Sequence, residues 1–368
     1  MKIPFLDLGP QWAEIRDEAE PVLARTFSSG RFVGGEEVEW FEKEFAAYVG
    51  RRFCVALSSG TAAEHYCLRA WGIGPGDEVI LPANTFVATA EAVALTGARP
   101  VLIDIEPDGI HACFKAAEKA ITSRTRAIIP VHLFGHCMDL DRWRKLADAH
   151  GIMLLEDACQ AHGARINERR AGTFGHAAAF SFYPAKNLGA CGDAGALVTD
   201  DEGLYEKLLM IRNHGASKPF DHQLVGSTER MDAIQAAVLR IKLKRLDDWN
   251  QRRRMRATQY VKALESVENL WLPRWGEAES PCHHLFVVRH RSRDGLARHL
   301  GRLGIGTGMH YPIPIHLMPA NRWLGLGQGS LPHTEHACET GISLPMGPHL
   351  SGEDCEKVIK AVLEFFER

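Results

Sequence analysis

One lysine, Lys186, lies among small and aromatic residues in the segment SFYPAKNLGACGDAG (residues 181–195). It follows the apolar, β-like run AAFSF (178–182) by a few residues. A lysine held in a pocket at a strand end loses solvation, so its pKa falls and its amine becomes a nucleophile toward carbonyl groups. A solvated loop lysine is the ordinary alternative, so Lys186 is a catalytic candidate only where other functional groups converge on it.

A second candidate is an anion-binding turn in VALSSGTAAEHYCL (residues 55–68), where a β-like run ends in Ser-Ser-Gly-Thr and a helical pattern begins at once. Backbone N–H groups at such a turn, with the helix dipole behind them, form a cradle for phosphate. The hydroxyl of Thr61, beside Gly60, adds a further donor. The alternative is that the Ser and Thr residues only cap the helix.

An acidic pair ends the apolar run in LLEDACQAHGA (residues 154–164). Ligands of open α/β sheets bind outside the carboxyl ends of the strands. Asp157 is therefore placed where a functional group is expected. For Glu156 we expect an exposed acidic loop instead.

Taken together, the three segments suit pyridoxal 5′-phosphate (PLP). This cofactor needs a phosphate cradle, an amine for its aldehyde, and an acid beside its pyridine nitrogen, so that the protonated ring acts as an electron sink. The Ser-Gly-Thr turn, Lys186 and Asp157 supply these parts. Asp157 and Lys186 are 29 positions apart, which leaves room for one crossover and the next strand.

Seven β-like runs between residues 52 and 200 must position these groups. They are FCVAL (53–57), EVILP (78–82), PVLIDI (100–105), RAIIPVH (126–132), IMLLED (152–157), AAFSF (178–182) and GALVT (195–199). Helical patterns lie between several of them, for example at 61–72 and 139–151. This alternation predicts an α/β fold whose sheet is mostly parallel and covered on both faces.

A second, smaller unit is expected after this sheet. Residues 231–267 show apolar residues at helical spacing over a long span, which is expected to carry the chain out of the first domain. Three further elements are expected: a strand at 283–290, a helix at 293–304 and a final helix near 351–367. We therefore predict a large α/β domain over residues 1–248 and a small α+β domain over residues 249–368.

The composition argues against several classes of partner. The net charge is −3, so no global field attracts nucleic acid or an anionic membrane, and no apolar run approaches the ~18 residues of a membrane helix. Nine cysteines without a C-x-x-C pattern fit reduced thiols in a cytoplasm.

The segment HLFGH (132–136) has two histidines but lacks the glutamate of the zinc-binding motif H-E-x-x-H. We weighed a zinc site there and prefer two histidines beside a strand end, with no metal.

At the level of whole blocks, the sequence resembles the sugar aminotransferases of the DegT/DnrJ/StrS family, PLP enzymes of the aspartate aminotransferase fold (fold type I). The resemblance runs through IPFLDL, GRFVGGEEVEWFEKEFAAYVG, GIGPGDEVILPANTFVATAEAV, PVHLFGH, EDACQAHGA, SFYPAKNLGACGDAGALVT, RNHG, HYPIPIHL and LPMGPHL. It implies a large PLP-binding domain around a mostly parallel, seven-stranded sheet.

The resemblance also implies roles for single residues. Lys186 matches the Schiff-base lysine, which also moves the proton between the cofactor and the substrate carbon. Asp157 is expected at the pyridine nitrogen and Gln160 at the ring hydroxyl. The remaining cofactor contacts are expected from Gly60, Thr61 and Ser181, which hold the phosphate, and from Phe86, which stacks on the ring.

One position departs from the family's pattern. The family commonly has an asparagine in a G-x-N-x-R segment that reaches the phosphate of the neighbouring subunit's PLP, and VGSTERMDAIQAA places Thr228 there. A threonine has a shorter reach but still donates one hydrogen bond. The resemblance implies a homodimer in which each active site uses both chains.

The expected substrates are L-glutamate, as amino donor, and a nucleotide-linked keto-sugar. The loop GIGTGMHYPIPIHLMPA (304–320) borders the active site in the family, and its form here looks most like enzymes that aminate C-3 of dTDP-3-keto-6-deoxyhexoses. The residues expected to hold the sugar nucleotide are Tyr183, His310, Tyr311 and His316; for His316 a structural turn is an equal alternative. Three competing functions remain. The first is amination at C-4 or of a UDP-linked sugar. The others are a PLP-dependent sugar dehydratase, which typically has histidine in place of the lysine, and a non-catalytic ligand-sensing regulator.

Overall fold

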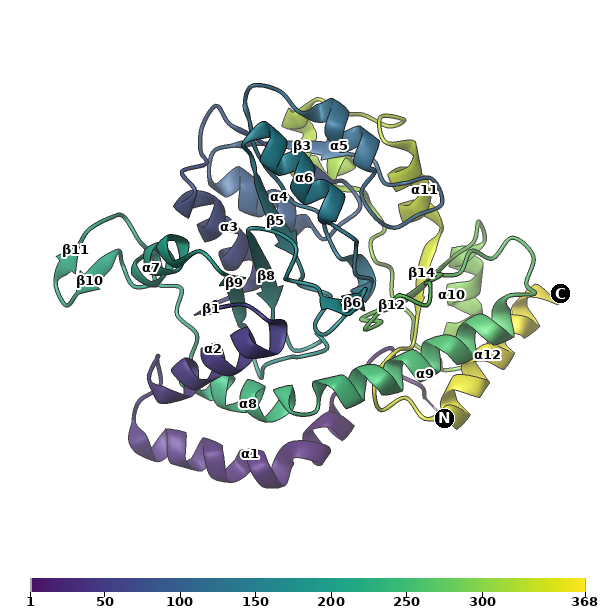
Figure 1. The fold of residues 1–368 in the computed structure, drawn as a ribbon. Coiled ribbons are helices and arrows are strands. Elements are labelled where there is room, and N and C mark those ends of the chain that lie inside the picture. The colour runs from purple at the N-terminus through teal and green to yellow at the C-terminus, as the bar shows by residue number, and fades with distance from the viewer. Residues whose placement is uncertain (1, 368) are drawn as a thin grey trace.

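The computed structural model describes residues 2–367 and is built around a seven-stranded sheet (Figure 1). In spatial order its strands are β1 (Phe53–Leu57), β9 (Gly195–Thr199), β8 (Ala177–Ser181), β5 (Met153–Asp157), β4 (Thr125–Ile128), β2 (Glu78–Pro82) and β3 (Arg99–Ile103). Only β9 runs antiparallel to its neighbours. The seven expected runs each form one of these strands, which confirms the mostly parallel α/β fold.

Helices cover both faces of this sheet, and the strands alternate accordingly. On β1, Cys54 and Ala56 face one hydrophobic core while Val55 and Leu57 face the other. The first core is closed by α2 (Glu36–Val49), α5 (Phe114–Ala120), α6 (Asp141–His150) and α8 (Ala233–Leu243). The second is closed by α3 (Gly60–Ala70), α4 (Val87–Leu95) and α7 (Glu202–Ile211). Because every strand is buried on both sides, its sequence is a continuous apolar run.

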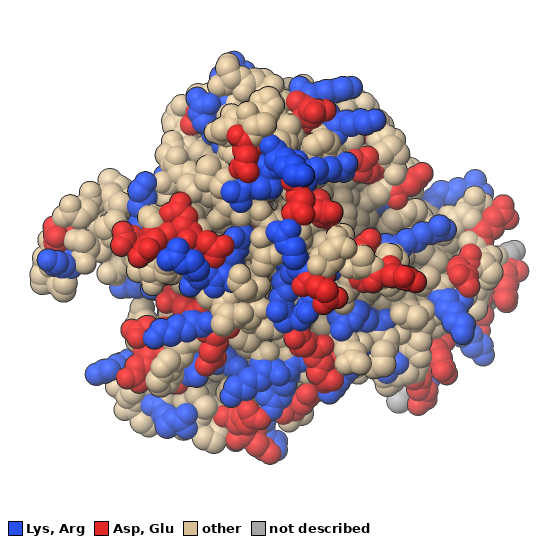
Figure 2. All heavy atoms as spheres, in the orientation of Figure 1, with Lys and Arg blue, Asp and Glu red and all other residues tan. Residues whose placement is uncertain are grey.

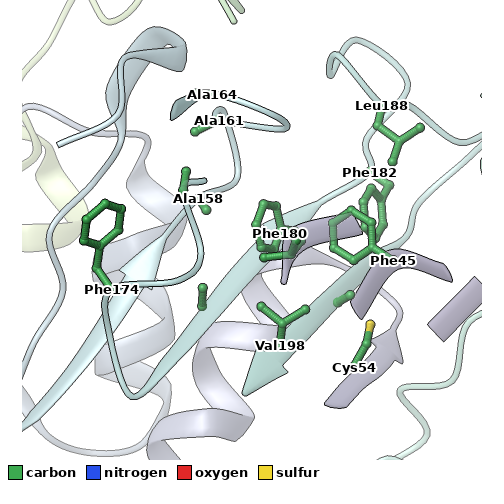
Figure 3. Close-up of a cluster of buried hydrophobic side chains, with 14 of the residues drawn as sticks. Phe45, Cys54, Ala158, Ala161, Ala164, Phe174, Phe180, Phe182, Leu188 and Val198 are labelled. Carbon is green, nitrogen blue, oxygen red and sulfur yellow. The ribbon is translucent and has the colours of Figure 1, made fainter. Parts of the chain in front are cut away.

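An aromatic cluster lies under the end of β8 that leads to Lys186 (Figure 3). The ring of Phe45 on α2 makes edge contacts with Phe180 at 5.0 Å and with Phe182 at 5.1 Å between centroids. All three side chains are almost completely buried. Truncating one such ring typically costs about 3–5 kcal/mol, so the point at which the lysine loop leaves the sheet is firmly anchored.

The long helical span at 231–267 is broken into two helices, α8 and α9 (Leu246–Leu264). The chain turns at Lys244 and Arg245, where the Arg245 N–H donates to the Lys242 carbonyl. No Gly or Pro marks this turn in the sequence. The turn lets α8 pack on α1 (Gly9–Ser29) and α2 while α9 packs on α12 (Gly352–Phe366), so tertiary packing decides the break.

The C-terminal unit has its own core between β13 (Phe286–Arg289), β14 (Gly341–Leu344), α9, α10 (Arg293–Arg302) and α12. Ile3, from the other end of the chain, packs into this core and bridges to Ile305. The proposed boundary after residue 248 stays a prediction. The remaining elements are β6 (Arg165–Ile166), β7 (Arg169–Arg170), β10 (Ala216–Lys218), β11 (Asp221–His222), β12 (Glu279–Ser280), α11 (Pro332–Thr340), and the 3₁₀ turns η1 (Leu133–Gly135), η2 (Ile315–Leu317) and η3 (Pro319–Leu324).

The surface shows no strong charge segregation on the face drawn in Figure 2, where acidic and basic side chains are interspersed. From residue 2 to residue 367, no helix is long and apolar enough to cross a membrane. In Figure 1 the β10–β11 hairpin projects away from the body of the chain. Phe220, in the turn of this hairpin, is 98% exposed.

Three histidines with lowered pKa values make the stability of the fold depend on pH. Burial lowers the pKa of His136 to about 4 and, together with nearby histidines, lowers that of His111 to about 3. Burial also lowers the pKa of His283 well below its usual value, and neither of its ring nitrogens has a hydrogen-bond partner within residues 2–367. These rings are therefore neutral in the folded protein.

We expect the free energy of unfolding to fall as the pH falls below about 6.5, the pKa of unfolded histidine. The unfolded chain then takes up protons that the folded chain does not, so each such histidine removes up to about 1.4 kcal/mol per pH unit until its folded pKa is reached. Urea unfolding at about pH 7.5 and about pH 5.5 measures this. His136→Asn should reduce the pH dependence, and equal stability at the two pH values would contradict the prediction.

Candidate functional site

The turn after β1 and the ends of β5 and β8 meet at one edge of the main sheet. A Cβ atom added to Gly60 would lie 2.7 Å from Cys159 Sγ and 2.8 Å from Ser181 Cβ. A Cβ added to Gly195 on β9 would overlap the backbone of Ser59. Only glycine allows backbones to approach this closely, so Gly60 and Gly195 bring the expected phosphate turn against the neighbouring strand ends.

The turn at the start of α3 has free donors. Ser59 caps the helix, since its hydroxyl oxygen accepts from the Ala62 N–H at 3.0 Å. The hydroxyl of Thr61 has no hydrogen-bond partner in the described part of the chain, and the N–H groups of Gly60 and Thr61 belong to the first helical turn, where no intrahelical acceptor exists. Ser59 therefore caps the helix, while Gly60 and Thr61 keep donors for an anion. Ser181 lies half-buried across from this turn.

Asp157 ends β5 and is only 5% exposed. Its Oδ2 accepts from Thr89 Oγ1 at 2.8 Å, and its Oδ1 accepts from the Cys159 N–H at 3.1 Å. Its backbone N–H donates to the Pro130 carbonyl at 3.0 Å. A carboxylate held from two sides in this way is oriented to accept one further N–H at a defined position.

Lys186 lies in a tight loop between β8 and β9, where its N–H donates to the Tyr183 carbonyl at 2.8 Å. Burial lowers the pKa of its amine, while the nearby acidic groups of Cys159 and Asp157 oppose that effect. A lowered pKa leaves more of the amine unprotonated and nucleophilic at neutral pH. The next residue, Asn187, donates to the Asn250 side chain and to the Cys282 carbonyl, both at 2.8 Å, and so ties the loop to α9.

Three further expected residues form a contiguous group. Gln160 is buried; its Oε1 accepts from the Phe134 N–H at 2.8 Å and its Nε2 donates to the Tyr311 hydroxyl at 3.0 Å. The Tyr311 ring lies 5.6 Å from the ring of Phe86, which is 51% exposed. Tyr311, expected at the sugar nucleotide, thus contacts two residues expected at the cofactor. Burial raises the pKa of Tyr311, so its hydroxyl keeps its proton.

The neighbouring His310 is a neutral imidazole. Its Nδ1 lies 2.8 Å from Ser343 Oγ, and its ring stacks on Phe5 at 5.5 Å. Burial, together with the charge of Lys186, lowers its pKa to about 4. Tyr183, in the lysine loop, is 55% exposed, so its ring is available to a ligand.

Two expected residues lie apart from this group within the chain. His316 is 1% exposed, and its Nε2 lies 3.0 Å from Glu335 Oε1. A side chain so enclosed supports η2 against α11 and has no open face for a sugar. Thr228 is exposed in the segment after the β10–β11 hairpin and lies 2.8 Å from His214 Nε2.

The expectation for Glu156 is wrong. Its side chain is completely buried and accepts hydrogen bonds from the backbone N–H groups of Gly172, Phe174 and Gly175, each at 2.7 Å. Burial by itself would raise its pKa, but the hydrogen bond from His132 and the other donors outweigh it and lower the pKa. Strand alternation explains the difference, since Glu156 faces the loop at 172–175 under the sheet rather than solvent.

The contact between Glu156 and His132 also argues against a zinc site in HLFGH. His132 Nε2 lies 2.9 Å from Glu156 Oε2, and His132 Nδ1 accepts from the Met138 N–H at 2.9 Å. Both ring nitrogens are therefore used within the protein, and His132 has no lone pair left for zinc.

Three residues of the site were missed by sequence reasoning: Thr89 and Cys159, which bind Asp157, and Glu64, which lies beside it. Thr89 lies one helical turn after Phe86 in ANTFVATA, so it could have been found once Phe86 was chosen. Glu64 stands among the small and apolar residues of α3, and an acid on a face that must be buried is a signal in itself.

The residues present fit PLP. The first turn of α3 leaves donors for a phosphate, Lys186 supplies an amine of lowered pKa, and Asp157 supplies a fixed carboxylate. Phe86 offers an exposed aromatic face, which suits stacking on a planar ring.

Comparison with known proteins identifies the family. The model of the DegT/DnrJ/EryC1/StrS aminotransferase family matches residues 13–363. The chain is 47% identical over 369 residues to dTDP-3-amino-3,4,6-trideoxy-alpha-D-glucose transaminase from Streptomyces venezuelae, covering 100% of this chain and 97% of that protein. It is also 47% identical over 361 residues to Erythromycin biosynthesis sensory transduction protein EryC1 from Saccharopolyspora erythraea, covering 98% of each.

A solved structure agrees with these relatives. The crystal structure of S. venezuelae DesV in complex with a ketimine intermediate matches with a TM-score of 0.98 at 47% sequence identity, covering 100% of this chain and 99% of that chain. The likeness spans both the large sheet and the C-terminal unit. The resemblance noted from the sequence blocks is therefore confirmed, and the chain belongs to the DegT/DnrJ/EryC1/StrS aminotransferase family.

Proposed function

We propose that this aminotransferase binds PLP at the edge of the main sheet and transfers an amino group from L-glutamate to C-3 of a dTDP-linked 3-keto-6-deoxyhexose. The observation that supports this most strongly is the meeting of the Lys186 amine, the fixed Asp157 carboxylate and the donor-rich turn of α3. The choice of C-3 and of dTDP is supported by the S. venezuelae relative, whose name specifies a dTDP-3-amino sugar.

When bound, PLP supplies an aldehyde that carries the amino group and a ring that accepts electrons. The Lys186 amine would hold that aldehyde and would move a proton to and from the substrate carbon. Asp157 would hold the proton on the ring nitrogen. Gln160 would donate to the ring hydroxyl, Phe86 would cover one ring face, and Gly60, Thr61 and Ser181 would hold the phosphate.

The sugar nucleotide is proposed to lie near Tyr183 and His310. Tyr183 is exposed in the lysine loop, and His310 is neutral and half-buried. A phenol and a neutral imidazole are suitable donors to phosphate or sugar oxygens. All nine cysteines are free thiols, which supports the proposal that the enzyme works in the cytoplasm.

The direct test is a panel of nucleotide keto-sugars with L-glutamate, with products read by mass spectrometry. We expect an amino sugar from the dTDP-linked 3-keto sugar, and ping-pong kinetics. Amination of a 4-keto sugar or of a UDP-linked sugar alone would overturn the substrate assignment while leaving the aminotransferase activity intact.

A regulatory function deserves the same test because EryC1, an equally similar relative, is named a sensory transduction protein. Adding glutamate to the PLP-loaded chain distinguishes the two functions. An enzyme changes the visible absorbance of the cofactor and releases 2-oxoglutarate, whereas a binding protein does neither. A dehydratase is disfavoured because position 186 is lysine, where such relatives typically have histidine.

The His310→Ala variant should raise KM for the sugar nucleotide about tenfold, because one hydrogen bond to a charged group is worth about 1.5–3 kcal/mol. The half-reaction with glutamate should barely change, since glutamate has no nucleotide. Steady-state kinetics for the sugar and stopped-flow rates for glutamate measure the two effects. Tyr311→Phe should raise the same KM, and an unchanged KM in both variants would remove this loop from the nucleotide site.

The Thr228→Ala variant tests the proposed shared active site of a homodimer. Losing one hydrogen bond to the partner's cofactor phosphate should weaken PLP retention by about tenfold. Equilibrium dialysis measures the loss, and Ser217→Ala, which alters the hairpin hydroxyl that bonds to Asp221, is the matched control. A monomer at assay concentration would contradict the shared-site arrangement directly.

A further inference from the structure

Glu64 is a carboxylic acid in an apolar setting. It lies in the second turn of α3, directly after the proposed phosphate turn, and only 2% of its surface is exposed. Its Oε2 is buried without a hydrogen-bond partner among the described residues. The proposed roles of the site residues do not use it, and a buried acid without a partner is costly for the fold.

The surroundings of Glu64 point toward the cofactor site. Oxygen atoms of Glu64 and Asp157 and the sulfur of Cys159 all lie within 4.8 Å of one another. The two charged groups that act on Glu64 are Asp157 on β5 and Lys186 in the lysine loop, and the thiols of Cys67 and Cys159 lie nearby. Glu64 thus lies beside the carboxylate that is proposed to face the pyridine nitrogen.

Two carboxylates this close in a buried site do not both ionise readily. Burial raises the pKa of Glu64 well above its usual value, and the charge of Asp157 raises it further. Asp157, by contrast, accepts hydrogen bonds from Thr89 and from the Cys159 N–H, which stabilise a negative charge. Glu64 is the member of the pair that keeps its proton.

We propose that Glu64 is a positioning residue that donates a hydrogen bond from its neutral carboxyl group to the Asp157 carboxylate. This proposal rests on the proposed function, because it concerns how Asp157 is presented to the ring nitrogen of PLP. With Thr89 and the Cys159 N–H, Glu64 becomes a third donor to Asp157 and limits its rotation. The remaining lone pair of Asp157 then points in one direction, which preorganises the contact with the cofactor.

The competing explanation for the same cluster is a metal ion held by Glu64, Asp157 and Cys159. Such a site would need both carboxylates ionised. It would also place a cation beside Lys186, whose own positive charge would oppose it. The hydrogen-bonded acid pair needs neither condition, so we favour it and make the metal an outcome of the test.

The test compares Glu64→Gln with Glu64→Leu in the full-length protein. The glutamine amide still donates to Asp157, whereas leucine fills the space without a donor. Infrared difference spectra of wild type against Glu64→Gln, taken near neutral pH with and without PLP, should show one protonated carboxyl group in the wild type. His65→Gln is the matched control, because that side chain lies on the same turn but bonds to the Ala92 carbonyl.

In PLP-loaded protein, Glu64→Leu should slow the half-reaction with glutamate about tenfold and shift the pH titration of the cofactor's visible absorbance, while Glu64→Gln stays within about threefold of wild type. Two kinetic results would overturn the proposal: a leucine variant that matches wild type, or two variants that lose the same activity. Infrared spectra that show an ionised Glu64 would also overturn it, as would a stoichiometric metal ion in the purified protein. If the leucine variant fails to fold, the infrared result still decides. A wild-type chain that takes up no PLP would overturn the proposed function as well, whereas the other failures leave that function intact.

Discussion

Lys186→Ala is expected to abolish aminotransferase turnover and to remove the visible absorbance of the bound cofactor. The physical reason is that the Lys186 amine is the group proposed to hold the cofactor aldehyde and to move the proton, and a positioned acid–base group alone contributes about 10²–10⁴ in rate. The fold should survive, because the loop is held by backbone hydrogen bonds and by the Asn187 side chain rather than by the lysine amine.

Borohydride reduction of the PLP-loaded protein, followed by peptide mass spectrometry, gives a readout that does not depend on turnover. The peptide containing Lys186 should carry the cofactor mass in the wild type and lose it in the variant. Lys242→Met is a matched control, because Lys242 is also a lysine of lowered pKa, and its buried amine donates to the Gly189 carbonyl at 2.7 Å in the same loop. Labelling at Lys242, or near-normal turnover in Lys186→Ala, would refute the assignment.

Asp157→Asn is expected to lower kcat by about one-hundredfold while PLP stays bound. A neutral amide no longer stabilises the proton on the ring nitrogen, and a hydrogen bond between charged partners is worth up to about 3 kcal/mol. The phosphate turn and Lys186 remain, so cofactor retention should change little. Stopped-flow rates of the half-reaction with glutamate and the PLP content after gel filtration separate the two effects.

Thr89→Ala provides the graded comparison for Asp157→Asn. It removes the 2.8 Å hydrogen bond to Oδ2 but leaves the carboxylate and the bond from the Cys159 N–H. Its effect on the half-reaction should be in the same direction and smaller, about tenfold. An unchanged rate in Asp157→Asn would mean that a different acid serves the ring nitrogen, and Glu64 would be the first to examine.

Local sequence was sufficient for the elements that carry the proposed cofactor residues. The run IMLLED forms a strand that ends at Asp157, and VALSSGTAAEHYCL forms a strand, a turn and a helix with Gly60 at the helix start. These assignments depend on continuous apolar runs and on turn residues, which act within a few positions along the chain. The resemblance to the aminotransferase family then assigned these separate segments to one cofactor site.

Local sequence was not sufficient where a side chain's role or a helix break depends on a distant part of the chain. Glu156 and Asp157 are adjacent in sequence, yet the pleat sends Asp157 to the site and Glu156 to the backbone of the 172–175 loop. The break between α8 and α9 has no Gly or Pro and follows from packing on α1, α2 and α12. For His316 the sequence left sugar binding and a structural turn as equal alternatives, and the side chain lies enclosed against Glu335.

By itself, the sequence determined the α/β class, the order of the seven strands along the chain, and the placement of Gly60, Asp157 and Lys186 at their ends, because these follow from apolar periodicity and turn chemistry. Only the tertiary structure decided which groups share one site and how burial and neighbouring charges shift their pKa values. The pKa of Lys186 falls because of burial, and Glu64 lies beside Asp157 because α3 packs against β8, the strand next to β5. Burial and charge proximity are properties of assembled elements, since both depend on distances between residues that are far apart in the chain.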